Sequence, residues 1–226
     1  MYLIAAMFTL PSFFLVSPWL KRFEDPAYQR VRIKETLKKI AAEKNLKKIY
    51  SSEFLLRFFY SWMIIYMPIY LHEFLGFDWK EIGIIFTAML VPFVILDYPL
   101  GKLSDKIGEK KMLAIGFTII SLSTISIFFI SSTDLVIWAL IMFATRVGAA
   151  TVEIMNESYF FKKIRAQDAG LISFFRNLFP LSLVISPLLA TILLFFLPYK
   201  FLFFISGVIL FYGIYLSFTI REIIHQ

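Results

Sequence analysis

Six ionisable side chains stand inside long apolar stretches of the sequence, where a charge has little water to solvate it. Near the centre of a membrane-spanning helix such a group costs about 2.5–3.5 kcal/mol on insertion scales, so it needs an opposite charge or a wet cavity. An acid beside an arginine can form an ion pair or exchange a proton, because burial favours its neutral form and the arginine favours its charged form. The six are Arg57, Asp97, Arg146, Glu153, Glu157 and Arg176.

Their depths predict a charged layer. At about 1.5 Å per residue, Arg57, Asp97, Glu153 and Arg176 all lie about 10 Å from the middle of their stretches, toward the same side. Glu153 and Arg176 are on consecutive stretches at matching depth, so we expect them to form an ion pair. Two functions stay open for the layer: ion pairs that close a gate, or proton exchange at Glu153 or Asp97.

Two further arrangements concern single helices. Glu53 and Arg57 are four residues apart, a spacing that allows a local ion pair. Arg146 lies near the middle of its stretch, where it would attract an anionic group in a central cavity or else serve packing alone. It shares one helix face with Ala149, Ala150, Glu153 and Glu157, and we expect that face to point inward because small residues allow close helix approach.

The stretches that carry these charges are long enough to cross a membrane. Of 226 residues, 59% are apolar and 17% charged, and none is cysteine. Soluble domains are about a quarter charged, so a water-soluble enzyme is excluded. A hydrocarbon core about 30 Å thick needs about 20 apolar residues per helix. We therefore expect an all-α membrane protein with seven spans, over residues 1–20, 52–75, 82–100, 112–130, 135–161, 169–197 and 201–220.

Basic residues mark one side of the membrane. Outside the spans, every lysine and arginine except Lys80 and Lys200 falls in one set of connections. Basic connections stay on the cytoplasmic side, which places the C-terminus in the cytoplasm and residue 1 outside, in a plasma or inner membrane. The net charge of +7 is then a consequence of topology, so we expect no binding of nucleic acid.

The longest polar connection covers residues 21–50. A helix start signal at Asp25 and Pro26 precedes apolar residues that recur at helical spacing among lysines. This pattern predicts a basic amphipathic helix, which lies along the inner membrane face or packs on the protein's own cytoplasmic loops. Its apolar residues are Ile33, Leu37, Ile40 and Ala41.

A short motif follows the third span. Gly101 would permit close helix approach, and Gly108 would permit a positive φ in the turn. Asp105 places a carboxylate near the start of the next helix, where the helix dipole favours negative charge. The pattern resembles the loop signature of the major facilitator superfamily, G-x-x-x-D-[RK]-x-G-[RK]-[RK]. It matches at Gly101, Asp105, Lys106, Gly108 and Lys110, whereas Glu109 replaces a basic residue and Lys111 supplies one just beyond.

This resemblance implies a fold and a function. Members have two six-helix halves, each built from two inverted three-helix repeats, with the substrate cavity between the halves. The chain then resembles the last helix of a first half (1–20), the central linker (21–50) and a whole second half (51–226). We expect a secondary active transporter of a small molecule that works by alternating access with proton coupling. The alternative is a non-transporting remnant or scaffold that binds a partner through its helix bundle.

The resemblance also implies a partner. A six-helix half supplies one wall of the cavity, so we expect an N-terminal half from the same gene or from a separate chain. Whether the chain is a truncated fragment or a free-standing unit stays open.

No pattern in the sequence predicts an enzyme: His72 and His225 are isolated, and there is no glycine-rich phosphate loop or nucleophile elbow. We therefore expect no catalytic residue, metal or cofactor.

Overall fold

The computed structural model describes residues 33–164 and 168–221. They belong to one compact unit, Arg32–Gln226, and the other unit, Met1–Val31, lies outside the described residues. The predicted span over residues 1–20 and the predicted helix start at Asp25 and Pro26 therefore also lie outside them. All the regular secondary structure in the described part of the chain is helical.

Six helical segments are long and apolar enough to cross a membrane, which confirms six of the predicted spans. The helix α3 begins at Lys44, inside the predicted linker, and α4 continues to Ile107, so that Gly108 alone separates it from α5. The segments are α3 (Lys44–Ile69) with the π-helical turn η1 (Tyr70–Phe74), α4 (Trp79–Ile107), α5 (Glu109–Ile127), α6 (Leu135–Lys163), α7 (Ala169–Arg176) with α8 (Leu178–Phe196), and α9 (Phe201–Thr219).

Local sequence explains several of these boundaries. Asp78 accepts a hydrogen bond from the backbone N–H of Glu81, whose side chain accepts one from the backbone of Asp78, a capping box that starts α4. Pro68 lies near the end of α3, just before the π-helical turn. Proline has no backbone N–H to donate, so the regular α-helical hydrogen bonding is interrupted there. Gly108 has a φ of +87°, the positive value predicted for this turn.

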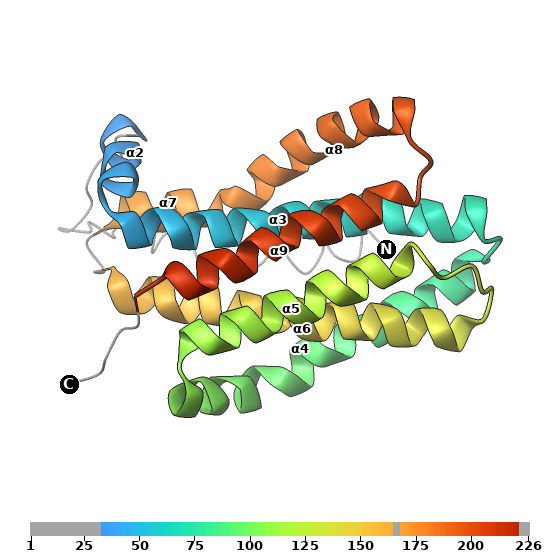
Figure 1. The fold of residues 1–226 in the computed structure, drawn as a ribbon, viewed down its shortest axis with the longest axis horizontal. Helices are drawn as coiled ribbons and strands as arrows, with labels where there is room; N and C mark the ends of the chain where they lie inside the picture. Colours follow the sequence, from blue (N-terminus) through green and yellow to red (C-terminus); the bar gives the residue numbers. More distant parts are fainter. Residues whose placement is uncertain (1–32, 165–167, 222–226) are drawn as a thin grey trace, which may run out of the picture. The chain divides into compact units, whose positions relative to one another are not determined.

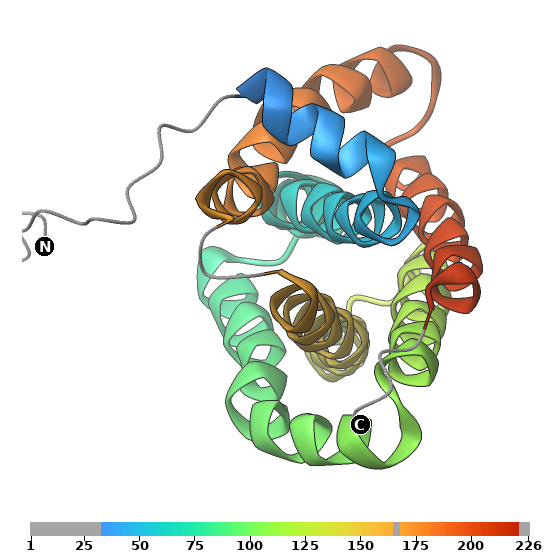
Figure 2. The same ribbon diagram turned by 90° about the vertical axis from the view of Figure 1, so that its left-hand side faces the viewer.

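The helices run side by side, with α6 in the middle of the unit (Figures 1 and 2). Helix α6 packs against α3, α4 and α5, while α9 packs against α5 and α3. Helix α8 packs mainly on α3 and diverges from it toward the far end (Figure 1). Each of these segments has a most apolar stretch of its own. Of that stretch, 22% is buried inside the unit in α4 and in α7–α8, against 61% in α3 with η1. These two outer helices leave most of their surface uncovered by the described residues.

Close packing between α5 and α6 depends on Gly148 of α6. A Cβ placed on Gly148 would lie 2.5 Å from the backbone nitrogen of Ile120 and 2.9 Å from the carbonyl oxygen of Gly116. Ala149 and Ala150 beside it are fully buried, as predicted for this face of α6, whereas the Glu157 side chain, predicted to share that face, is 33% exposed. The close approach predicted at Gly101 is not found, because a Cβ there would meet no described atom within 4 Å. Helix α4 is on the outside of the unit at that point, so no neighbour reaches it.

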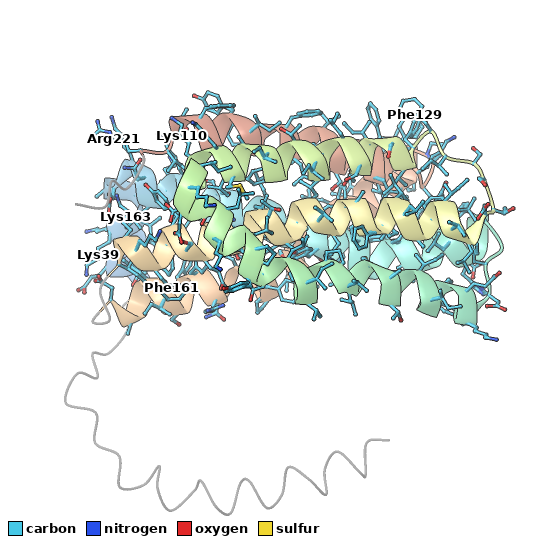
Figure 3. The ribbon with its side chains drawn as sticks, turned by 90° about the horizontal axis from the view of Figure 1, so that it is seen from below. Lys39, Lys110, Phe129, Phe161, Lys163 and Arg221 are labelled. Carbon is cyan, nitrogen blue, oxygen red and sulfur yellow. The ribbon has the colours of Figure 1, made fainter. Side chains whose placement is uncertain are left out.

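Basic side chains gather at one end of the bundle. Lys39, Lys110, Lys163 and Arg221 lie at this end, and Phe129 lies at the opposite end (Figure 3). We call it the basic end. The fold thus brings the connections rich in lysine and arginine to one end of the bundle. That this end faces the cytoplasm stays a prediction.

The helix α2 (Ile33–Ala42) lies within the predicted amphipathic segment. It packs on α3 and α7, and Lys39 forms an ion pair with Asp168 at 3.3 Å. Ile40 is buried in this contact, but Ile33 and Leu37 are exposed. The helix therefore packs on the bundle with one part of its apolar stripe and leaves the other part exposed.

Candidate functional site

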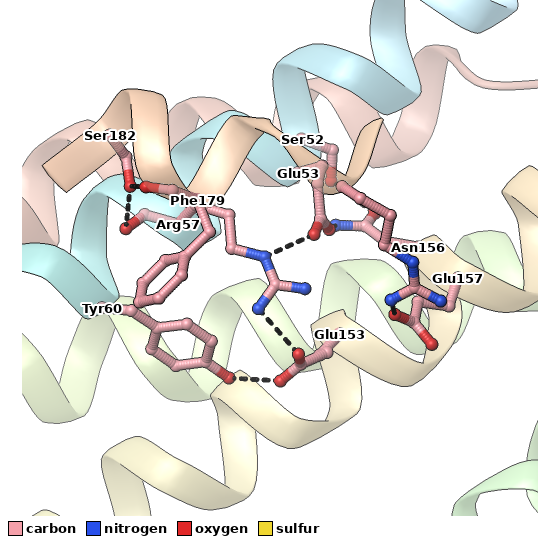
Figure 4. Close-up of polar contacts among 10 residues, drawn as sticks. Ser52, Glu53, Arg57, Tyr60, Glu153, Asn156, Glu157, Phe179 and Ser182 are labelled. Carbon is pink, nitrogen blue, oxygen red and sulfur yellow. Dashed lines mark hydrogen bonds and ion pairs between the residues drawn. The ribbon is translucent and has the colours of Figure 1, made fainter. Parts of the chain in front are cut away.

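Polar side chains of α3 and α6 meet in the interior of the bundle near the basic end (Figure 4). Residues three or four apart lie on one face of a helix, so each helix presents a row of polar groups to the other. We call this group the inner polar cluster. It consists of Ser52, Glu53, Arg57 and Tyr60 from α3 and Glu153 and Asn156 from α6.

Arg57 bridges two carboxylates. Its Nε donates to Glu53 Oε1 at 2.6 Å, and its Nη1 donates to Glu153 Oε1 at 2.8 Å. The predicted local pair of Glu53 and Arg57 is confirmed. On the other side of Arg57, helix α8 provides support: Ser182 Oγ donates to the Arg57 carbonyl oxygen at 3.0 Å, and the Phe179 ring lies 5.9 Å from the guanidinium carbon. These contacts fix the position of the guanidinium between the two acids.

The predicted ion pair of Glu153 with Arg176 is wrong. Arg176 instead pairs with Glu157, at 2.6 Å. The reason is the position of the helix ends. Counted at about 1.5 Å per residue from the ends of α6 and α7 at the basic end, Arg176 and Glu157 lie about 10 Å deep, whereas Glu153 lies about 15 Å deep. At the depth of Glu153, the basic side chain that reaches it is Arg57 of α3.

The two acids of the cluster differ in exposure. The Glu53 side chain is 0% exposed and that of Glu153 is 21% exposed. Glu53 also accepts a hydrogen bond from Asn156 Nδ2 at 3.0 Å, and Ser52 Oγ donates to Asn156 Oδ1 at 2.7 Å. Asn156 and Ser52 were missed by sequence reasoning, although Asn156 lies one helical turn after Glu153 and Ser52 directly precedes Glu53. Glu53 is thus enclosed by partners, and Glu153 is the acid that reaches the surface.

Arg146 lies deeper, among aromatic rings. Its guanidinium carbon is 4.8 Å from the ring centroid of Tyr60 and 4.8 Å from that of Phe93, and its Nη2 is 3.8 Å from Met89 Sδ. Within residues 33–164 and 168–221, no carboxylate lies in ion-pair distance of it. Rings held near a cation stabilise it through their negative faces. The Tyr60 hydroxyl donates to Glu153 Oε2 at 2.8 Å, which connects Arg146 to the inner polar cluster.

Three other charged residues of the predicted layer lie at the surface of the unit. Glu157 and Arg176 have side chains 33% and 55% exposed. Asp97 is exposed on α4, and the structure joins it to no residue of the described part by a hydrogen bond or an ion pair. Asp97 is therefore separate from the cluster. Charged groups exposed within a span avoid lipid, so these surfaces of α4, α6 and α7 require protein or water beside them.

The loop motif forms a second polar contact at the basic end. Glu109, which departs from the family signature, is buried and pairs with Lys162 of α6 at 2.5 Å. It also accepts a hydrogen bond from Ser158 Oγ at 2.9 Å. Asp105 is exposed on the last turn of α4. The substituted acid therefore attaches the start of α5 to the end of α6.

The described residues include no group of three or more His, Cys, Asp or Glu side chains placed to hold a metal ion. His72 has a local structural contact, since its Nδ1 lies 2.8 Å from the carbonyl oxygen of Phe77 and its ring 4.6 Å from that of Trp79. The chemistry of the site is thus that of carboxylates, guanidiniums and hydroxyls, which can exchange protons and attract anions.

Comparison with known proteins agrees with the loop motif. The model of the Major Facilitator Superfamily matches residues 1–179 and, in a second alignment, residues 49–223. The second match begins in α3 and extends past the end of α9, so it includes nearly all of the six described spans. No curated protein matches the chain significantly. The chain belongs to the Major Facilitator Superfamily and is a membrane protein of this transporter family.

Proposed function

We propose that the chain forms one half of a secondary transporter that moves a small anionic molecule together with a proton by alternating access. The observation that carries this proposal is the connected series from Glu53 through Arg57 and Glu153 to Tyr60 and Arg146. It joins Glu153, the acid of the series that reaches the surface, to Arg146, which lies deeper in the bundle.

The charges of this series support coupling of a proton to an anion. With both acids ionised, Glu53 and Glu153 balance Arg57 and Arg146. A proton on Glu153 leaves one positive charge in excess, and an unbalanced charge in a poorly solvated interior is costly. An anionic group near Arg146 restores the balance. Proton and anion therefore favour each other's binding, as a symporter requires.

The arrangement also supports Glu153 as the proton carrier in preference to Glu53. Arg57 and Glu53 lie on one helix, so they stay paired when α3 moves relative to α6. Glu153 lies on α6, and separation of the two helices breaks its hydrogen bonds from Arg57 and Tyr60. The same movement exposes Glu153 to water. In this proposal the movement of α3 relative to α6 within this half accompanies alternating access, in which one repeat or bundle rocks against another.

A second bundle is part of the proposal. The outer surfaces of α4 and α7–α8 are mostly uncovered, and they carry the exposed charges of Asp97 and Arg176, the latter paired with Glu157 of α6. Another six-helix half, from the same gene upstream or from a separate chain, would cover these surfaces and supply the other wall of the cavity. We expect the chain reconstituted alone to show no uptake, and uptake by it alone would contradict this part of the proposal.

The test of coupling expresses the chain together with the proposed N-terminal half and reconstitutes the protein into liposomes loaded with a pH-sensitive dye. Small mono- and dicarboxylates are added outside, with neutral amides of the same size as controls. We expect proton influx with one or more of the anions and its loss in Glu153→Gln. Glu73→Gln, an exposed acid at the opposite end, serves as the matched control and keeps the flux. Flux that survives Glu153→Gln would contradict the proposal.

Orientation in the membrane is tested separately. We propose a cell membrane in which the basic end faces the cytoplasm. The chain has no native cysteine, so single cysteines can be introduced without background labelling. A maleimide that cannot cross membranes should label Ser131→Cys in intact cells and should label Lys111→Cys only after the cells are opened. The reverse pattern would show that the bundle is inserted the other way.

A further inference from the structure

A pocket separate from the inner polar cluster lies between the beginning of α3 and the end of α9. Its volume is about 280 Å³. Lys44, Lys47 and Lys48 line it from α3, and Tyr212, Tyr215 and Thr219 line it from α9. We propose that this pocket binds the phosphate of an anionic phospholipid in the leaflet at the basic end.

The first support is unbalanced positive charge. The lining contains three lysines and neither aspartate nor glutamate. The nearest acid along the chain, Glu43, is engaged by Lys163 at 2.5 Å. The ammonium group of Lys48 donates to the carbonyl oxygen of Thr219, which holds it at the α9 side of the pocket. Lys44 and Lys47 are exposed, and the structure gives them no acidic partner in the described part of the chain.

The second support is the apolar side of the same pocket. Tyr212 and Tyr215 are exposed, and their rings stack with centroids 5.7 Å apart. Tyrosines gather where a protein crosses the boundary between headgroups and acyl chains, because the ring is apolar and the hydroxyl polar. Lysine stems can lie along such apolar surface while the ammonium stays at the boundary. The pocket therefore offers cations on its α3 side and apolar ring surface on its α9 side.

This combination selects a lipid over free phosphate. An inorganic phosphate would use the three ammonium groups alone, whereas a phospholipid uses the ammonium groups for its phosphate and the tyrosine side for its glycerol and upper acyl chains. Basic pockets between spans on the cytoplasmic side are suited to acidic headgroups. A zwitterionic lipid brings its own cation into the pocket and gains less from the lysines.

The experiment measures lipid binding to the purified full chain by native mass spectrometry. Dioleoyl phosphatidylglycerol and dioleoyl phosphatidylcholine are added to the detergent-solubilised protein in parallel, and inorganic phosphate is added in a third arm. We expect one phosphatidylglycerol to be retained, with binding about 30-fold weaker in Lys44→Gln/Lys47→Gln, because each basic side chain near an acidic lipid contributes about a fivefold factor. Lys44→Arg/Lys47→Arg keeps both charges and should keep binding.

The matched control is Lys102→Gln/Lys106→Gln, which removes two exposed charges at the basic end but outside the pocket. It should bind phosphatidylglycerol as the native chain does. Equal binding of phosphatidylcholine would overturn the proposal, as would an equal loss in the control. Displacement of the lipid by inorganic phosphate at the same concentration would show that the pocket takes free phosphate instead. Lys44 and Lys47 are exposed, so the substitutions do not disturb the packing of the bundle.

Discussion

Replacing Arg57 with methionine tests whether the inner polar cluster depends on a single cation. Methionine keeps much of the apolar volume of the arginine stem, but it lacks the guanidinium that Glu53 and Glu153 share. Glu53 is fully buried, so its carboxylate loses an ion pair at 2.6 Å and gains no water in return. Breaking a buried ion pair in this way costs about 3–5 kcal/mol. We expect Arg57→Met to lower the free energy of unfolding by that amount.

The matched control is Arg176→Met, which breaks the pair with Glu157. That pair is 55% and 33% exposed, and pairs reached by water contribute at most about 1 kcal/mol. Unfolding is induced by sodium dodecyl sulfate in mixed micelles and followed by tryptophan fluorescence, to which the buried Trp62 and Trp138 contribute. The two arginine variants should differ by several-fold in their free-energy loss.

A double variant separates charge from packing. Glu53→Gln in the Arg57→Met background removes the unpaired carboxylate and keeps an amide oxygen that can accept from Asn156. We expect it to recover most of the lost stability, because the cost comes from the uncompensated charge. Equal losses in Arg57→Met and Arg176→Met, or a double variant no more stable than Arg57→Met, would refute the assignment of Arg57 as the central cation.

Two further predictions concern packing and the loop motif. Gly148→Ala should lower the free energy of unfolding by about 1–3 kcal/mol, because its Cβ would lie 2.5 Å from the Ile120 backbone and overpacked sites cost this much. Gly83→Ala, whose Cβ would meet nothing within 4 Å, is the control and should lose no stability in the same assay. Glu109→Lys should destabilise the bundle by placing two cations together, and adding Lys162→Glu should restore stability by reversing the pair. Failure of this exchange would show that the Glu109 contact contributes nothing as an ion pair.

The spans were predictable because apolar length is a local property. A run of about 20 apolar residues reports a membrane crossing wherever its neighbours lie. The start of α3 at Lys44 was not predictable in this way. The first turns of α3 lie outside the apolar run and carry lysines. Lysine stems tolerate the boundary between bilayer and water, so the helix can extend beyond the apolar run. A boundary set by hydropathy therefore falls inside the helix.

The inner polar cluster was predictable only where its contacts are local. Glu53 and Arg57 are four residues apart on one helix, so their pairing follows from helix geometry. The partner of Glu153 depends on which helices are neighbours and on where each one ends. A shift of about one helical turn, about 5.4 Å, is enough to exchange Glu153 for Glu157 as the partner of Arg176.

Glu109 shows why a family signature read position by position gives an incomplete account. At the sequence level the acid is a departure, since the signature has a basic residue there. In the fold it lies beside Lys162, far along the chain, and the pair supplies the opposite charge that an acid at this position needs. Because a buried carboxylate is costly without a partner, the acid is tolerated only in a chain that also has the cation. Glu109 and Lys162 form one structural feature, and the contact between α5 and α6 brings them together.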